Sequence, residues 1–187
     1  MKNNLIGIYF IKKYLIILLF IIIQIEVKLL FKKINVAYGL NNKYTYPTLV
    51  SMISILENAS HNTFYTFYIL IEKGLFKKEN KAKFLNLEKK YDRFKIIFLE
   101  IASDRFFNAN TKRYPITTYY RLLLAELIED VNRIIYLDGD TIVFTDLSEM
   151  INLEMKNNII LGFVDSGYLR AMKFGIKTFK YITQVFY

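Results

Sequence analysis

The sequence predicts an α/β domain with a mostly parallel, Rossmann-like sheet that carries helices on both faces. Three observations predict this class. From residue 33 onward, apolar strand-like runs alternate with helical patterns and few long breaks separate them. The first runs follow one another as strand, helix, strand, helix and strand, which is typical of a doubly wound parallel sheet. The length of 187 residues suits one domain with a substantial core.

The individual elements follow from apolar runs and helical spacing, taken in order along the chain. Strands are expected at 34–40, 64–71, 94–101, 133–138 and 157–165. Pro47 opens the first helix, whose apolar face is expected to hold Leu49, Val50, Ile53 and Leu56. A charged amphipathic helix is expected at 76–90. A third helix is expected to bury one apolar stripe, made of Ile116, Tyr119, Tyr120, Leu123, Leu124 and Leu127.

The N-terminal segment differs in kind from the rest of the chain. Residues 14–25 contain almost nothing polar and follow Lys12 and Lys13. This run is shorter than the roughly 20 residues that span a bilayer, although residues 5–30 would suffice if flanking lysines snorkel. An anchor or peripheral segment and a spurious extension both remain open, and no cleavage site favours a removed signal. We therefore expect residues 1–32 to form a hydrophobic N-terminal helix outside the domain.

Composition restricts the chemistry available to the chain. There is no cysteine and only one histidine, His61, so disulfides and Cys- or His-rich metal sites are excluded. We expect His61 to be a solvated loop residue. The formal net charge of +9 could suit an anionic partner, but the lysines are scattered and no Arg-rich helix or zinc-finger spacing supports nucleic acid. Any metal must therefore be held mainly by oxygen.

The segment "IIYLDGDTIV" (134–143) places Asp138 and Asp140 just past the carboxyl end of the fourth strand. Open α/β sheets bind ligands at that edge. Carboxylates one residue apart on an extended chain point to opposite faces, but Gly139 would let the backbone turn so that both approach one cation. Hard oxygen ligands suit Mn²⁺ or Mg²⁺ bridging a diphosphate. The alternative is structural, with Asp138 capping the next turn and Asp140 solvated.

Longer stretches of sequence resemble the glycosyltransferases of family 8, which are retaining enzymes of the galactosyl- and glucosyltransferase type. In that family a Tyr-x-Arg-Leu helix precedes a strand and a "YLD-x-D-x-(I/V)-V-x-x-D-L" segment. Here "YYRLL" and "YLDGDTIVFTDL" match in order and at close spacing within 116–150. The opening "INVAYGLNNKYTYPTLVSMISIL" is also similar to the family's first strand, nucleotide-contacting loop and first helix. The resemblance spans about residues 33–165.

The resemblance implies a GT-A fold that binds a UDP-linked sugar, with Mn²⁺ held by the Asp-x-Asp motif. Asp138 and Asp140 would be the metal ligands, with Asp138 also near the ribose, and Gly139 would contribute a backbone contact. Spacing alone favours Arg121 as a surface charge, but the resemblance implies that it reaches the donor's sugar or diphosphate. Asp165 falls where the family places a carboxylate close to the transferred sugar, so Arg121 and Asp165 are the expected catalytic residues.

The resemblance also implies a donor-binding loop at the end of the first strand. Asn41, Asn42 and Tyr44 would hold the uracil and ribose, and Gly39 belongs to the same expected donor site. The family commonly has Asp at the position of Asn41, where it accepts from the uracil N–H. An amide oxygen can still accept, so we expect weakened rather than lost binding.

The expected function is transfer of a hexose from a UDP-sugar to a glycan or lipopolysaccharide-type acceptor, with retention and dependence on Mn²⁺. We expect a cytoplasmic protein. Residues 5–30 could attach it to a membrane. Nothing after Asp165 matches the family's His-x-x-Gly-x-x-Lys-Pro-Trp motif, whose histidine completes the metal site. We therefore expect an incomplete GT-A domain at 33–165 and an unassigned tail at 166–187.

Two alternatives to this function stay open. A C-terminally truncated chain could be a non-catalytic remnant of such an enzyme. The segment "LDGDTIV" also resembles the Asp-x-Asp motif of haloacid-dehalogenase-type phosphatases, in which the first aspartate is a nucleophile. That interpretation is less favoured, because it needs the motif on the first strand, whereas three predicted strands precede it here.

Overall fold

The computed structural model describes residues 13–22, 31–106, 115–156, 158, 160–162 and 185–186. The chain divides into two compact units, Met1–Lys32 and Lys33–Tyr187. In the first unit residues 13–22 are helical and expose apolar side chains such as Leu15 and Phe20. The rest of the predicted 5–30 segment lies outside the described residues. Within the described ranges, no helix is both long enough and apolar enough to cross a bilayer.

As far as β4, the second unit alternates strands and helices in the predicted order, with short 3-10 helices (η) between them; α5 and β5 were not predicted. The elements are β1 (Lys32–Gly39), η1 (Asn42–Tyr44), α2 (Thr45–Glu57), β2 (Thr63–Glu72), α3 (Lys78–Leu85), η2 (Asn86–Lys89), β3 (Phe94–Ile101), η3 (Ser103–Phe106), η4 (Ile116–Leu123), α4 (Leu124–Leu127), β4 (Ile135–Tyr136), α5 (Ser148–Ile151) and β5 (Val185–Phe186).

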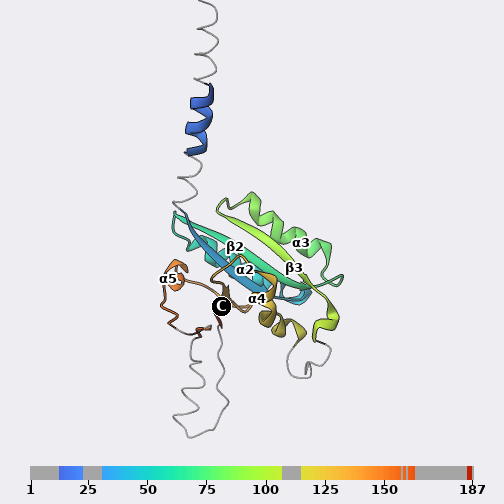
Figure 1. The fold of residues 1–187 in the computed structure, drawn as a ribbon. Helices are drawn as coiled ribbons and strands as arrows, with labels where there is room; N and C mark the ends of the chain where they lie inside the picture. The colour runs from blue at the N-terminus through green and yellow to red at the C-terminus, as the bar shows by residue number, and fades with distance from the viewer. Residues whose placement is uncertain are drawn as a thin grey trace, which may run out of the picture. The chain divides into compact units, whose positions relative to one another are not determined.

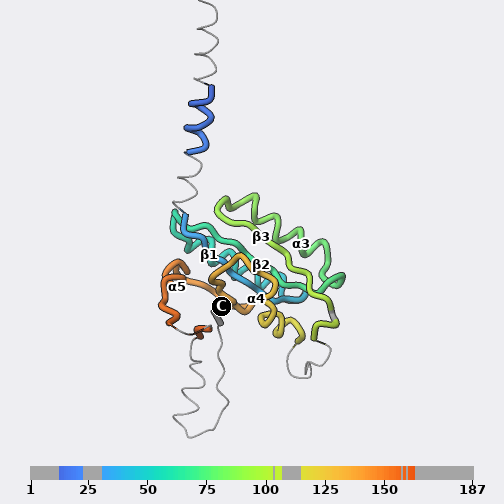
Figure 2. The backbone as a smooth tube through the Cα atoms, in the orientation of Figure 1, coloured from blue at the N-terminus to red at the C-terminus, as the bar shows by residue number. Residues whose placement is uncertain are grey.

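The strands form one sheet in the order β3-β2-β1-β4-β5. The first three strands lie side by side in Figure 2. β2 pairs with β3, and β1 with β4, in parallel, whereas β5 is antiparallel to β4. The register places Val36 opposite Ile135. The strand order therefore reverses between β1 and β4, which makes this the topological switch point of the sheet. Of the predicted strand at 157–165, residues 157, 159 and 163–165 are outside the described part, and Leu161 forms only an isolated bridge.

Two buried clusters cover the two faces of the sheet. Within β1 and within β2, odd-numbered and even-numbered residues belong to different clusters, because successive side chains of a strand point to opposite faces. Phe67 and Ile69 of β2 pack with α2 and α3, whereas Tyr68 and Leu70 pack with η4 and α4. Figure 1 shows α3 and α4 on opposite sides of the sheet. The predicted α/β architecture with helices on both faces is thus what the chain adopts.

The first helix differs in detail from the prediction. α2 begins at Thr45, two residues before Pro47, so the proline lies within the first turn, where its missing N–H costs little. Val50, predicted on the apolar face, is 52% exposed, whereas Thr48 and Ser51 are fully buried. The buried face of α2 is therefore rotated toward small hydroxyl residues, because Thr48 and Ser51 contact the segment that follows Asp138.

The predicted continuous helix over 116–127 is wrong in type. Residues Ile116–Leu123 form the 3-10 helix η4, and only Leu124–Leu127 are α-helical. A 3-10 helix has three residues per turn, and accordingly Thr117, Tyr120 and Leu123 are the buried positions of η4. Leu127, the predicted end of the stripe, is 37% exposed.

Candidate functional site

Two segments far apart in the sequence meet at the switch point between β1 and β4. The loop that enters η1 follows the carboxyl end of β1, and Asp138 follows that of β4. The Leu137 amide donates to the Ala37 carbonyl at 3.0 Å, which continues the pairing to the end of both strands. The expected donor loop and acidic pair therefore lie at the same edge of the sheet. Doubly wound sheets bind their ligands in this position.

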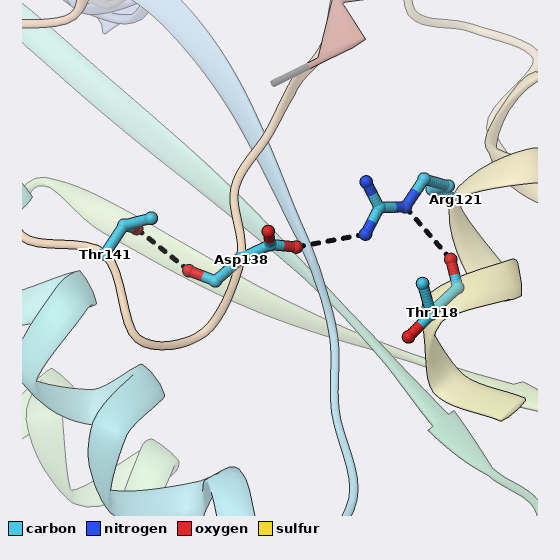
Figure 3. Close-up of polar contacts among 4 residues, drawn as sticks. All are labelled: Thr118, Arg121, Asp138 and Thr141. Atoms are coloured by element: carbon cyan, nitrogen blue, oxygen red, sulfur yellow. Dashed lines mark hydrogen bonds and ion pairs between the residues drawn. The ribbon is translucent and has the colours of Figure 1, made fainter. Parts of the chain in front are cut away.

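Arg121 of η4 points at Asp138 across this edge (Figure 3). Its Nη2 atom donates to Asp138 Oδ1 at 3.0 Å, and its Nε atom donates to the Thr118 carbonyl at 2.9 Å. The guanidinium carbon also lies 4.4 Å from the centroid of the Tyr136 ring. The Arg121 side chain is only 18% exposed, so the surface position that spacing alone favoured is wrong. The guanidinium is instead held against a carboxylate that is 47% exposed.

The backbone turns directly after Asp138. The Thr141 hydroxyl donates to the Asp138 carbonyl at 2.9 Å (Figure 3). The Thr141 amide donates to the same carbonyl at 3.1 Å. Asp138 thus supports the turn through its carbonyl, and its carboxylate pairs with Arg121 instead of capping. The Asp140 side chain is exposed, and no hydrogen bond or ion pair reaches it from the described residues. The turn leaves Asp140 available to an external ligand.

Gly139 packs tightly within this turn. A Cβ at this position would clash with Thr48 Oγ1 of α2 and would lie 3.4 Å from Tyr44 Cδ1. The glycine is thus needed for close approach to α2 rather than for an unusual φ. The same contact places Tyr44, which is 40% exposed, beside the Asp-Gly-Asp turn. Gly139 therefore brings the predicted donor loop and the acidic pair into contact.

The two asparagines of the predicted donor loop have different surroundings. Asn41 caps η1 by accepting from the Lys43 amide at 2.9 Å. Asn42 Oδ1 accepts from the Lys77 amide and from Asn80 Nδ2, both at 2.9 Å, and its Nδ2 donates to the Leu75 carbonyl at 2.9 Å. Asn42 therefore holds the loop between β2 and α3, a structural role that the sequence did not indicate. A contact of Asn42 with the nucleotide remains a prediction.

Gly39 is also surrounded by close neighbours at the end of β1. A Cβ here would lie 2.6 Å from the Thr117 carbonyl oxygen and 3.0 Å from the Tyr136 hydroxyl. The absence of a side chain thus allows η4 to approach the strand. Because Arg121 belongs to η4, this contact contributes to the placement of the guanidinium. A direct contact of Gly39 with the donor remains a prediction.

Sequence reasoning missed a row of polar side chains on α2 and its C-cap residue that holds the segment after Asp140. The Ser51 and Thr141 hydroxyls lie 3.2 Å apart. Ser54 Oγ accepts from the Val143 amide at 2.9 Å, and Asn58 Nδ2 donates to the Val143 carbonyl at 3.1 Å. A spacing of three to four residues puts these side chains on one helix face. That polar spacing was the available signal, but polar helix positions are usually exposed.

Asp146 is a second residue that the sequence did not single out. Its carboxylate accepts from the Ser60 and Ser148 amides at 2.7 Å each, and from the Thr63 and Tyr65 hydroxyls at 3.0 Å each. Burial alone would raise the pKa of Asp146, but these hydrogen bonds hold it well below its ordinary value. Asp146 therefore ties the segment after the acidic pair to the loop between α2 and β2.

The carboxylate pair has the donor chemistry of a magnesium or manganese site. Both side chains offer hard oxygen atoms, and both are accessible at an edge where a ligand can approach. No group of three or more acidic or histidine side chains suited to a metal occurs in the described ranges. His61 is exposed, as predicted, and Asp165 lies outside the described residues.

A switch-point edge with an acidic pair beside a loop and an arginine is the arrangement in which doubly wound α/β sheets bind nucleotides and other ligands. Glycosyl transferase family 8 matches residues 35–186, and the chain belongs to this family.

Curated relatives from bacteria agree with the family assignment. Lipopolysaccharide 1,3-galactosyltransferase of Salmonella typhimurium is 29% identical over 139 residues, which cover 73% of this chain and 40% of that protein. Lipopolysaccharide 1,2-glucosyltransferase of Escherichia coli is 30% identical over 124 residues, 66% of this chain and 36% of that protein. A putative glycosyltransferase of Haemophilus influenzae is 32% identical over 125 residues, with coverages of 66% and 36%. The chain thus spans at most 40% of the length of these relatives.

Solved structures share the fold. The crystal structure of the galactosyltransferase LgtC with donor and acceptor sugar analogs has a TM-score of 0.65 at 23% identity, covering 82% of this chain and 57% of that one. The apo structure of the bifunctional glycosyltransferase WbbM has a TM-score of 0.61 at 17% identity, with coverages of 83% and 31%. The fold is therefore GT-A-like, and these matches give no support to the phosphatase alternative.

Proposed function

We propose that this chain is the nucleotide-sugar-binding part of a hexosyltransferase that moves a hexose from a UDP-sugar to a glycan or lipopolysaccharide-type acceptor with retention. The observation that carries the proposal is the meeting of the Asp138–Asp140 turn, the η1 loop and Arg121 at one edge of the sheet. Two relatives with lipopolysaccharide in their names support the class of acceptor. The family assignment supports the class of reaction.

The proposal assigns a divalent cation, Mn²⁺ or Mg²⁺, to Asp138 and Asp140. Such ions keep several waters and bind through one or two carboxylates together with substrate phosphates. When bound, the ion acts as a Lewis acid that stabilises negative charge on the departing diphosphate. Asp140 has no competing partner among the described side chains, whereas Asp138 shares its charge with Arg121. Both residues can therefore serve as ligands without breaking the core.

Arg121 supplies fixed positive charge beside the same diphosphate. Its guanidinium is oriented by the Thr118 carbonyl and the Tyr136 ring, so little rotamer freedom is lost when an anion binds. A hydrogen-bond donor that is oriented before the reaction stabilises the transition state, where negative charge on the leaving group is greatest. In the proposed roles, Asn41 and Tyr44 contact the nucleoside and Asp165 lies near the transferred sugar.

Binding of UDP to the full chain, measured by calorimetry with Mn²⁺ and again with EDTA, tests the proposal. We expect binding that needs the metal and that is lost in Asp138→Asn and Asp140→Asn. The matched control is Asp92→Asn, since Asp92 is an exposed carboxylate that contacts Arg93 only at 3.7 Å. UDP binding that is equal in EDTA contradicts the metal assignment. Absence of any UDP binding by the folded wild-type chain contradicts the function.

Hydrolysis of UDP-galactose and UDP-glucose separates an enzyme from a non-catalytic remnant. We expect release of UDP that depends on Mn²⁺ and on both aspartates, with a preference for one of the two sugars. Metal-dependent UDP binding without any release would favour the remnant.

The apolar helix at 13–22 supports a further part of the proposal, namely work at a membrane surface. All ten of its residues are exposed, and most are large and apolar. Co-sedimentation of the full chain with phospholipid vesicles tests this association. Binding should fall in Leu18→Lys, and equal binding of this variant would contradict it.

A further inference from the structure

A chain of hydroxyl groups runs from the core of the sheet to the acidic turn. The Tyr38 hydroxyl on β1 lies 2.8 Å from Ser51 Oγ on α2, and Ser51 Oγ lies 3.2 Å from Thr141 Oγ1. Thr141 Oγ1 in turn lies 2.9 Å from the Asp138 carbonyl oxygen. Tyr38 and Ser51 are fully buried. The turn that presents the carboxylates is thus connected to a rigid strand through helix α2.

The direction of every hydrogen bond in this chain follows from counting protons. Each hydroxyl carries a single proton, and a carbonyl oxygen can only accept. Thr141 donates its proton to the Asp138 carbonyl, so it must accept from Ser51. Ser51 then has no proton left for Tyr38, which must therefore donate to Ser51. The chain runs in one direction, from Tyr38 to Asp138.

The start of the chain is suited to this direction. Burial raises the pKa of Tyr38 well above its ordinary value, so the phenol keeps the proton that it donates. Its ring stacks against Phe67 with 6.4 Å between centroids, inside the cluster under α2 and α3. The Tyr38 hydroxyl therefore has a fixed position and a fixed protonation state. Loss of any link leaves the next hydroxyl without its donor, and a buried group without its partner is costly.

We propose that Tyr38, Ser51 and Thr141 are positioning residues that set the conformation of the Asp138–Asp140 turn and thereby the presentation of its two carboxylates. None of the three has to touch the cation or the donor, because they act through the Asp138 carbonyl. The part that concerns the cation rests on the function proposed above. The part that concerns the turn can be measured without any ligand.

Ser54 offers a matched control on the same helix. It lies three residues after Ser51 and also binds the segment after the acidic pair. Its hydroxyl accepts from the Val143 amide and donates to the Ser51 carbonyl, and among the described residues it has no hydrogen bond to Thr141 or Asp138. Ser51→Ala and Ser54→Ala are the same chemical change one turn apart. The proposal requires different local effects from these two variants.

Amide hydrogen exchange of the ligand-free chain, followed by NMR, is the first test. The Thr141 amide donates to the Asp138 carbonyl, so we expect it to exchange about five-fold faster in Ser51→Ala, as expected for one lost hydrogen bond. Ser54→Ala should accelerate the Val143 amide and leave the Thr141 amide unchanged. Equal acceleration of both amides in both variants would overturn the proposal, because it would mean general loosening of the segment.

Mn²⁺ binding to the full chain is the second test. We expect about five-fold weaker binding in Ser51→Ala and Thr141→Val, wild-type binding in Ser54→Ala, and recovery in Thr141→Ser, which restores the hydroxyl. Weaker binding that follows overall stability in all four variants would overturn the proposal. If Ser51→Ala does not fold, Thr141→Val removes the same bond from the loop side and carries both tests.

The two proposals fail in distinguishable ways. A wild-type chain that binds no Mn²⁺ contradicts the proposed function, while the exchange result for the Thr141 amide still decides the role of the hydroxyl chain. A wild-type chain that binds Mn²⁺, with Ser51→Ala and Thr141→Val binding equally well, contradicts the positioning role alone.

Discussion

Arg121 and Asp138 form an ion pair with 3.0 Å between Nη2 and Oδ1, at the place where the chain is proposed to bind a cation and a diphosphate. The Asp138 carboxylate thus pairs with Arg121 of η4 and also faces the proposed ligand. A positive charge beside a metal ligand disfavours the metal and favours an anion. Arg121 should therefore affect binding of the metal and of the donor in opposite directions.

Replacement of Arg121 by alanine tests this opposition. We expect Arg121→Ala to bind Mn²⁺ alone a few-fold more tightly, because a competing cation is removed, and to bind UDP about ten-fold more weakly in the presence of Mn²⁺. Stability should fall by only about 1 kcal/mol, since the pair is partly exposed. Calorimetry with each ligand measures both effects. Arg105→Ala, which removes a surface pair with Glu126, is the control, and a change of the same sign for both ligands would refute the argument.

The two glycines at the site should respond differently to alanine. In Gly39→Ala the new Cβ would meet the backbone oxygen of Thr117, so relief needs a shift of η4, and we expect a loss of about 1–3 kcal/mol in the free energy of unfolding. In Gly139→Ala the Cβ would meet the side-chain oxygen of Thr48. Adding Thr48→Ala should restore much of that loss, because this oxygen has no hydrogen-bond partner within the described structure. Urea unfolding of the single and double variants gives the coupling, and strict additivity would contradict it.

Asp146 should make stability depend on pH. Its pKa in the folded chain lies below the ordinary value, so its contribution is full above the ordinary pKa of about 4 and is lost as the pH falls toward the folded value. We expect Asp146→Asn to be less stable than wild type at pH 7 by about 1–3 kcal/mol, because an amide cannot accept from all four donors. The difference should shrink between pH 5 and pH 3. Urea titrations at several pH values measure it, and a constant difference would contradict the assignment.

Asn41 and Asn42 should separate binding from stability. Asn42→Ala removes three hydrogen bonds to the loop between β2 and α3, so we expect a lower thermal midpoint. Asn41→Ala removes only a cap of the short helix η1, so stability should change little while UDP binding weakens several-fold. Thermal unfolding and UDP calorimetry on both variants decide this. A purely structural loop would show no effect of Asn41→Ala on UDP binding.

Sequence reasoning succeeded where a long apolar run decides the structure. β1, β2 and β3 were predicted within two residues at each end, because buried parallel strands are continuous apolar runs. It failed for Ile116–Leu123, since apolar residues spaced three apart fit both an α-helix and a 3-10 helix. The acidic pair was found because it follows a strand. Ser51 and Asp146 were missed, because their roles depend on partners about 90 residues away in the chain.

The pairing of Val36 with Ile135 has a consequence for how the protein folds. The two residues are separated by about 100 positions in the chain, so their contact closes a long loop. The entropic cost of closing this loop must be met before the strand pairing can stabilise the fold. β1, β2 and β3, with α2 and α3, can assemble from nearer contacts while the ribosome is still producing β4. We therefore expect the ligand-binding edge to be absent from early folding intermediates and to appear only when β4 docks against β1.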